Sequence, residues 1–264
     1  MRKTISVAII TKNEEANLAR TLESVRWADE RIVVDSGSTD HTVEIARDHG
    51  AKVFLEEWKG FAGQKNSAIA KCTGELVLSL DADEEVSAEL ATEIQAMLSG
   101  DAPGRAYSVP RRNHFLGRWI RYGGYFPDRK LRLFPRGACV FEERTVHESM
   151  QLAGNIALDA SSLQGSLYHH SYPTLEDYIE HMNRYSSLGA EMASSAGKAS
   201  RSLPAFVNHV LLNPAATFAY NYLFRLGFLD GREGLLLHLY HSAYISWKYA
   251  KAWQISRKSG SDSA

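Results

Sequence analysis

The sequence predicts an α/β fold, with a mostly parallel sheet that helices cover on both faces and a helical extension at the C-terminal end. Three observations support this prediction. Short apolar runs alternate with helical periodicity over the first hundred residues, polar residues follow several of these runs directly, and helical periodicity returns after residue 173. Strands and helices that alternate along a chain are typical of parallel sheets with helices packed against them.

The first half of the chain contains the alternating elements. Four apolar runs predict buried strands at residues 5–10, 32–34, 53–55 and 76–80. The first intervening helix follows from the spacing of Leu18, Leu22 and Val25 on one helical face. We expect Thr39 to cap a second helix that Gly50 closes. Two further helices are predicted around residues 66–70 and 87–98.

The second half of the chain has a different residue pattern. Turn residues at 101–104 lead into segments rich in aromatic residues and arginine, and Asp177 is placed to support the start of a helix after Thr174. We therefore expect three parts, at residues 1–103, 104–172 and 173–264. The first two would form one α/β domain, and the third would be its helical extension.

Composition excludes several classes of protein. The chain has 264 residues, of which 44% are hydrophobic and 23% charged, so it is neither a disordered nor a multi-span membrane protein. A net charge of −1 gives no general affinity for nucleic acid. Cys72 and Cys139 are too few for a disulfide framework, which favours a reducing compartment. The apolar run at residues 5–10 is too short for a signal peptide, so we expect a cytoplasmic protein.

Polar segments follow three of the predicted strands, at residues 11–14, 35–40 and 81–85. Ligands of open parallel sheets bind outside the carboxyl ends of the strands. The sequence has neither a GxGxxG turn nor a GxxxxGK[ST] loop, which removes the usual dinucleotide and P-loop sites. Asp81 and Asp83 would point to the same side of an extended strand and could face one divalent cation. The alternative is an acidic first helical turn, in which Glu84 and Glu85 favour the helix dipole.

These three segments together resemble the nucleotide-diphosphosugar-binding domain of family-2 inverting glycosyltransferases, which has the Rossmann-like GT-A fold. The resemblance rests on Thr11-Lys12-Asn13-Glu14, on Val34 to Asp40 and on Asp81-Ala82-Asp83-Glu84. It implies that Asp83 binds Mg²⁺ or Mn²⁺ and that residues 1–103 form the nucleotide-sugar-binding half of the domain. The implied nucleotide-sugar-binding residues are Thr11, Asn13, Glu14, Asp35, Lys65, Asp81 and Arg132.

Further segments resemble bacterial lipopolysaccharide core β-1,4-glucosyltransferases. They include residues 58–61, 64–66, 111–113, 117–118, 125–128, 132–134, 146–148, 183–185 and 227–231. This resemblance implies transfer of a hexose, glucose, from UDP-glucose to a heptose of a lipid-linked inner-core oligosaccharide, with residues 104–172 as the acceptor-binding half.

A basic segment supports an anionic ligand independently of the resemblance. Residues 111–136 contain eight Lys or Arg and one acid, a net charge of +7. Arginine matches phosphate and carboxylate oxygens in a bidentate manner, so we expect Arg111, Arg112 and Arg118 to bind the acceptor. A solvated basic face or a nucleic-acid patch is the alternative.

Glu148 is our candidate for the general base, because it follows a predicted strand beside His147. Its position also resembles that of the family's catalytic acid residue. Glu142 and Glu143 are the alternatives. His147 and His169 are candidate metal ligands. His169 and His170 are adjacent on a predicted strand and would point to opposite faces, so only one of them can join the site.

The helical extension is basic and amphipathic. Residues 201–258 contain seven Lys or Arg against two acids, interleaved with Leu, Phe, Tyr and Trp. This pattern is typical of a helix on a membrane surface, here the inner leaflet, and equally of a helix packed on the core or on a second subunit. Two other functions stay open at this point. One is a sugar nucleotidyltransferase, although residues 11–17 lack the glycine that its phosphate loop would need. The other is a non-catalytic carbohydrate- or lipid-binding protein on the same fold.

Overall fold

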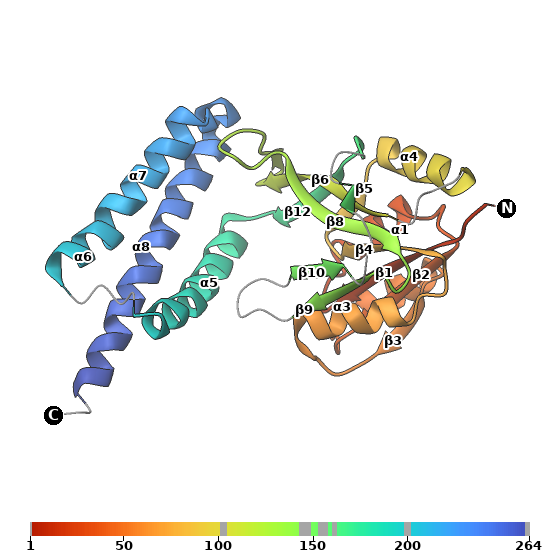
Figure 1. The fold of residues 1–264 in the computed structure, drawn as a ribbon, viewed down its shortest axis with the longest axis horizontal. Coiled ribbons are helices and arrows are strands. Elements are labelled where there is room, and N and C mark those ends of the chain that lie inside the picture. Colours follow the sequence, from red (N-terminus) through yellow and green to blue (C-terminus); the bar gives the residue numbers. More distant parts are fainter. Residues whose placement is uncertain are drawn as a thin grey trace. The chain divides into compact units, whose positions relative to one another are not determined.

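The computed structural model describes residues 2–100, 105–142, 149–152, 158–159, 163–197 and 202–261. These residues form two compact units, which we describe separately. The first unit contains residues 1–112 and 127–170, and the second contains residues 113–126 and 171–264. Figure 1 shows the elements of both units.

The first unit is built on the alternating half of the chain. Its first elements are β1 (Ile5–Thr11), α1 (Leu18–Ser24), β2 (Glu30–Asp35), α2 (Thr42–Asp48), β3 (Lys52–Leu55), α3 (Gly60–Ala70), β4 (Leu76–Asp81), β5 (Glu84–Val86) and α4 (Ala88–Ser99). Strands β3, β2, β1 and β4 are neighbours in that order and run parallel. The prediction of a parallel sheet is therefore confirmed for this half.

The remaining strands extend the sheet in a mixed manner. They are β6 (Ala106–Phe115), β7 (Arg118–Trp119), β8 (Asp128–Pro135), β9 (Cys139–Glu142), β10 (Ser149–Leu152), β11 (Leu158–Asp159) and β12 (Leu167–Tyr172). β8 pairs antiparallel with both β4 and β6, and β12 pairs antiparallel with β5. β9 and β10 form a separate antiparallel pair.

Helices cover both faces of the sheet because its strands are apolar on both sides. Ile5, Val7 and Ile9 of β1 pack in one buried cluster with side chains of α1 and α4. Ala8 points to the opposite face and packs in a second cluster with Ala62 of α3. Successive residues of a strand point to opposite faces, so one strand supplies both cores. Figure 1 shows α3 and α4 on opposite sides of the strands.

The start of α2 differs from the prediction. The helix begins at Thr42 with His41 at its N-cap, so the cap lies two residues after Thr39. Asp40, which precedes His41, accepts hydrogen bonds from the backbone N and the Oγ1 of Thr42 and so fixes the chain at the helix start. Gly50 follows the helix with φ +70°, as expected of a closing glycine.

The second unit is largely helical. It contains α5 (Leu175–Ser195), α6 (Leu203–Val207), a π-helix η1 (Asn208–Leu212), α7 (Asn213–Ala219), a π-helix η2 (Tyr220–Phe224), a 3₁₀ turn η3 (Gly227–Asp230) and α8 (Gly231–Ser261). A capping box between Thr174 and Asp177 starts α5, as the sequence predicted. α8 lies between α5 and the run from α6 to η2 (Figure 1). Within the described residues, we find no helix with the length and apolar character that crossing a membrane requires.

Candidate active site

The carboxyl ends of β1, β2 and β4 meet at one edge of the sheet. The pairing register sets Thr11 of β1 beside Asp35 of β2, and Ile10 beside Asp81 of β4. Thr11 Oγ1 donates a hydrogen bond of 3.0 Å to Asp35 Oδ2, and both residues are buried. The backbone N of Gly37 and of Ser38 donate to Asp35 Oδ1. Asp35 thus holds the β2 turn and the end of β1 together.

The loop after β1 is tied to the loop after β2. Asn13 has a positive φ of 56°, which asparagine tolerates better than most residues. Its backbone N donates to Ser38 Oγ at 2.8 Å, and its side-chain Oδ1 accepts from the backbone N of Thr39 at 2.8 Å. The backbone N of Glu14 donates to Thr42 Oγ1. These bonds place the candidate nucleotide-binding residues Thr11, Asn13, Glu14 and Asp35 on two mutually braced loops.

The Glu14 carboxyl group is in an environment that favours its protonated form. Burial raises its pKa above the ordinary value, and the Asn17 side chain opposes this by donating to Glu14 Oε2 at 3.0 Å. The carboxylates of Asp83, Asp40 and Asp81 raise the pKa further. Several acids therefore converge around this edge, and their mutual repulsion would favour a cation there.

Asp81, at the end of β4, lies between two buried cations. Its carboxylate is 2.7 Å from Lys65 Nζ and 2.5 Å from an Arg132 guanidinium nitrogen. Both cationic side chains are only 6% exposed. Burial by itself raises the pKa of Asp81, but Arg132 and Lys65 outweigh it and hold the pKa well below its usual value. Three candidate nucleotide-binding residues, Lys65, Asp81 and Arg132, are thus brought together.

Glu84 also belongs to this cluster. It lies on β5 and α4 begins only at Ala88, so the alternative of an acidic first helical turn is wrong for this residue. Its side chain is fully buried and accepts from Arg132 at 2.7 Å and from Arg111 at 3.1 Å. Its other oxygen accepts from the backbone N of Asp81 at 3.1 Å, which closes the turn after β4. The sequence does show an acid directly after Asp81-Ala82-Asp83 and arginines much later in the chain. Only folding, however, brings these side chains into contact.

Asp83 does not share its partners with Asp81. Residues 82 and 83 form a turn, so the expectation that Asp81 and Asp83 lie on one extended strand is wrong, and the two carboxylates take different neighbours. Asp83 Oδ2 is 3.2 Å from His169 Nε2 on β12. Burial raises the pKa of Asp83, but His169 more than offsets it, and the pKa lies below its usual value.

The neighbouring histidine points elsewhere. His170 Nε2 is 3.2 Å from Glu85 Oε2, so the expected division of His169 and His170 between two faces is observed. In the described part of the chain, no three His, Cys, Asp or Glu side chains gather as a complete metal cage. The carboxylate of Asp83 and the imidazole of His169 nevertheless form a two-ligand set, and Mg²⁺ and Mn²⁺ accept such a set when substrate phosphates supply further ligands. These two residues therefore fit a divalent metal.

Among the described residues, the buried polar groups without a hydrogen-bond partner include two that lie beside the site. They are the side-chain amide of Gln64 and the hydroxyl of Ser36. Gln64 is fully buried in α3, immediately before Lys65, and Ser36 immediately follows Asp35. The sequence analysis gave neither residue a role of its own. Unpartnered buried polar groups are rare, because each costs free energy.

The basic segment is divided between several environments. Arg111 is paired with Glu84 and, at 2.7 Å, with Asp128. This pairing and that with Lys130 outweigh burial and lower the pKa of Asp128 to about 2. Arg112 has its guanidinium 5.4 Å from the centre of the Tyr168 ring. Arg118 belongs to the second unit, where it is 3.8 Å from Glu233.

Several of the candidates for base and metal binding, His147, Glu148 and Glu143, lie outside the described residues. Glu148 directly precedes Ser149, the first residue of β10. The third candidate base, Glu142, ends β9 and accepts from Gln151 Nε2 at 2.6 Å. It is exposed, so its surroundings supply little desolvation to activate it.

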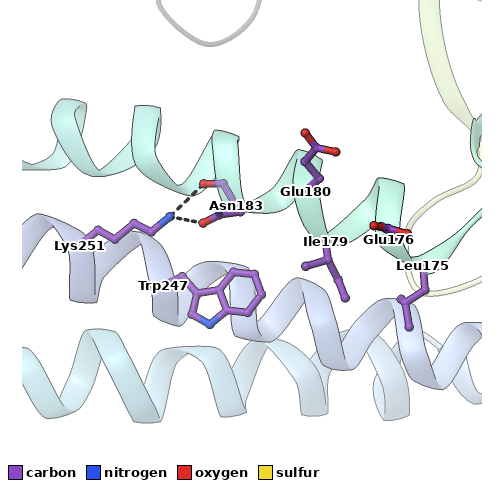
Figure 2. A pocket seen from close by; sticks show the side chains of 7 residues that line it. All are labelled: Leu175, Glu176, Ile179, Glu180, Asn183, Trp247 and Lys251. Atoms are coloured by element: carbon purple, nitrogen blue, oxygen red, sulfur yellow. Dashed lines mark hydrogen bonds between the residues drawn. The ribbon is translucent and has the colours of Figure 1, made fainter.

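The second unit contains a groove of about 710 Å³ between α5 and α8. Figure 2 shows Lys251 of α8 reaching Asn183 of α5 and Trp247 beside it. Lys251 Nζ donates to the backbone O and side-chain Oδ1 of Asn183 and to the hydroxyls of Ser186 and Ser187. The Lys251 ammonium group therefore joins α8 to α5.

Comparison with known proteins identifies the family. Residues 6–149 match the model of glycosyl transferase family 2. The chain is 38% identical to an uncharacterized glycosyltransferase of Rickettsia typhi, covering 74% of this chain and 70% of the relative. It is 31% identical to the lipopolysaccharide core biosynthesis glycosyltransferase LpsC of Rhizobium meliloti, covering 75% and 74%.

The fold also matches a solved structure. A mannosyltransferase from Pyrobaculum calidifontis, solved with GDP-Man and Mn²⁺, superimposes with a TM-score of 0.53 at 19% identity and covers 96% of this chain and 87% of that one. Together with the strand order and the matched residues, this likeness supports the GT-A fold. The chain therefore belongs to glycosyl transferase family 2 and is a glycosyltransferase.

Proposed function

We propose that the protein transfers glucose from UDP-glucose, with inversion, to a heptose of a lipid-linked lipopolysaccharide inner core. The observation that carries the proposal is the edge formed by β1, β2 and β4. Thr11 pairs with Asp35 there, Asp81 pairs with the preceding Ile10, and the Asp83 to His169 ion pair follows the end of β4. The name of LpsC, a lipopolysaccharide core biosynthesis glycosyltransferase, supports the class of acceptor.

In this proposal, residues 1–103 bind the donor. Thr11, Asn13, Glu14 and Asp35 hold the nucleoside between the two braced loops. Lys65 and Arg132 supply positive charge beside Asp81, which their ion pairs keep ionised and oriented. A divalent cation held by Asp83 and His169 would neutralise the negative charge that develops on the leaving diphosphate.

Residues 104–172 bind the acceptor in this proposal, and Arg111, Arg112 and Arg118 contribute the positive charge that suits its anionic groups. The acceptor hydroxyl oxygen attacks the anomeric carbon while the bond from that carbon to the diphosphate oxygen breaks. The electron pair of the broken bond leaves with the diphosphate. We propose Glu148 as the base that takes the proton of the acceptor hydroxyl. His147 is its neighbour and a further candidate metal ligand.

We place the reaction in the cytoplasm, at the inner-leaflet surface of the membrane, with residues 173–264 contacting either that surface or a second subunit. Two features support this location. Cys72 and Cys139 are both buried free thiols, which suits a reducing compartment. A lipid-linked acceptor is held at a membrane surface by its own lipid.

A thermal-shift panel tests the donor and the metal together. We expect UDP-glucose with Mn²⁺ to raise the melting temperature more than GDP-mannose or either component alone. Asp83→Asn should lose the Mn²⁺-dependent part of this shift. Asp48→Asn, at an exposed position at the end of α2, is the matched control and should retain it. An unchanged Mn²⁺ dependence in Asp83→Asn would remove the proposed metal site, and a larger shift with GDP-mannose would remove the proposed donor.

A further inference from the structure

The run of helix from α6 to η2 exposes large apolar side chains along its length. We call six of them, all more than half exposed, the outer stripe. They are Leu203 (75%), Leu211 (63%), Leu212 (55%), Tyr220 (57%), Leu223 (53%) and Phe224 (77%). Single exposed apolar residues are ordinary on protein surfaces, but a continuous row of them marks an interaction surface.

The opposite side of the same run packs against α8. Ser246 Oγ of α8 donates to the backbone O of Val210 at 2.8 Å, and Ser242 Oγ donates to the backbone O of Pro214 at 2.8 Å. Pro214 itself is buried. The run therefore has an inner side that α8 covers, and the outer stripe lies on side chains that α8 leaves exposed.

The π turn η1 helps to keep exposed side chains in one row along the first part of the run. In an α-helix, residues four apart are displaced by about 40° around the axis, so a row at this spacing drifts off one side. A π turn has hydrogen bonds between residues five apart and contains more residues per turn. Residues four apart in a π turn are therefore displaced around the axis in the opposite direction, which compensates the drift. Here α6 and α7 alternate with η1 and η2, and exposed Leu203, Val207, Leu211 and Ala215 follow at intervals of four.

The charges around the outer stripe have one sign. The sequence contains no Asp or Glu from residue 192 to residue 229. Arg225 directly follows the run, Arg232 lies in the first turn of α8, and both are exposed. The next two acids along the chain both have partners elsewhere. Asp230 is buried and accepts hydrogen bonds from the backbone N of Arg121 and of Tyr122. Glu233 lies 3.8 Å from Arg118.

We propose that the outer stripe docks on the surface of an anionic phospholipid bilayer. Its apolar side chains would enter the boundary between headgroups and acyl chains, and Arg225 and Arg232 would meet the headgroup phosphates. The complementarity of charge favours a bilayer over a second copy of the chain, since a second copy would bring the same acid-free surface against this one. The inference rests on the proposed function only in that a lipid-linked acceptor gives the docking a purpose.

Flotation with vesicles tests this surface. The vesicles contain phosphatidylethanolamine with phosphatidylglycerol, and pure phosphatidylcholine vesicles serve as the neutral comparison. We expect the full chain to float with the anionic vesicles and to lose much of this binding in about 0.5 M NaCl, where charge attraction is screened. Leu211→Ser/Phe224→Ser should lower the partition coefficient by about tenfold or more. Leu55→Ser/Val140→Ser, at positions 64% and 51% exposed in the first unit, is the matched control and should float like the parent chain.

The outcomes separate this inference from the proposed function. Asp83→Asn should float normally, because its position is at the sheet edge. Flotation that is absent for the parent chain, or equal for the parent and Leu211→Ser/Phe224→Ser, would overturn the docking surface and leave the proposed reaction untouched. A parent chain that is dimeric by light scattering, does not float, and becomes monomeric in Leu211→Ser/Phe224→Ser would assign the outer stripe to a second copy instead.

Discussion

Replacing Arg132 by methionine tests whether the buried ion pairs hold the edge of the sheet in place. The Arg132 guanidinium contacts both Asp81, at 2.5 Å, and fully buried Glu84, at 2.7 Å. Methionine keeps much of the apolar volume of the arginine side chain and removes its charge. The change therefore leaves two carboxylates with fewer cations and creates little empty space.

The structure sets the size of the expected loss. Removing one partner of a buried ion pair costs about 3–5 kcal/mol of unfolding free energy, because the other charge stays buried. Asp81 keeps Lys65 at 2.7 Å and Glu84 keeps Arg111 at 3.1 Å, so we expect a loss near the lower end, about 3 kcal/mol. Urea unfolding followed by far-UV circular dichroism measures this loss.

Two further variants make the result specific. Arg129→Met removes an exposed arginine from the same strand, β8, and should cost less than about 1 kcal/mol. Glu84→Gln/Arg132→Met should be less destabilised than the sum of its two single changes, by about 1 kcal/mol or more, because the unpaired charge on Glu84 is gone. A loss in Arg132→Met no larger than in Arg129→Met would refute this reasoning.

Three other predictions concern pH and packing. Glu30 is buried, which raises its pKa, but hydrogen bonds from Lys52, Ser6 and Thr73 outweigh this and lower the pKa to about 2. Its contribution to stability is therefore full above about pH 4.5 and is lost as the pH falls toward about 2. Glu30→Gln should make the urea midpoint depend less on pH over this range. Equal pH dependence in the parent chain and the variant would contradict this prediction. Burial lowers the pKa of His238 from 6.5, with a further lowering by His241, so protonation below pH 6.5 favours unfolding. His238→Gln should then lose less melting temperature than the parent between about pH 7.5 and about pH 5.5, and an equal loss would argue against this role. A Cβ on Gly165 would come within 2.3 Å of Leu90 Cα, so Gly165→Ala should cost about 1–3 kcal/mol by urea unfolding, whereas Gly100→Ala, whose nearest neighbour is 3.8 Å away, should cost much less; equal costs would contradict the packing argument.

Local patterns were sufficient for the four parallel strands and the helices between them in residues 1–100. The apolar runs that predicted strands became β1, β2, β3 and β4, and their parallel order was confirmed. A run of this kind must be covered on both faces, and the helical segments between the runs supply that cover. The cap of α2 was placed two residues early, because the start of this helix depends on the turn that Asp35 organises and on the hydrogen bonds from Thr42 to Asp40.

The candidate site was predicted in part. The polar segments after β1, β2 and β4 follow from the rule that strand ends carry ligands, and the division of His169 and His170 follows from strand geometry. The prediction that Asp81 and Asp83 lie on one extended strand was wrong. The backbone turns at residues 82 and 83, and Glu84 accepts a hydrogen bond from the backbone N of Asp81 across this turn. The roles of the site residues stay predictions.

The amino-acid order alone was enough to establish the strand and helix pattern of residues 1–100, the acidic segment after β4 and the acid-free segment before Asp230, because these depend on residues close together in the chain. Folding decided which distant side chains neutralise one another. Lys65, Asp81, Glu84, Arg111 and Arg132 come from five elements, and their pairing depends on strand order and register. Such contacts join residues dozens of positions apart, so local periodicity carries no information about them, and only the packed sheet brings the charges within reach of one another.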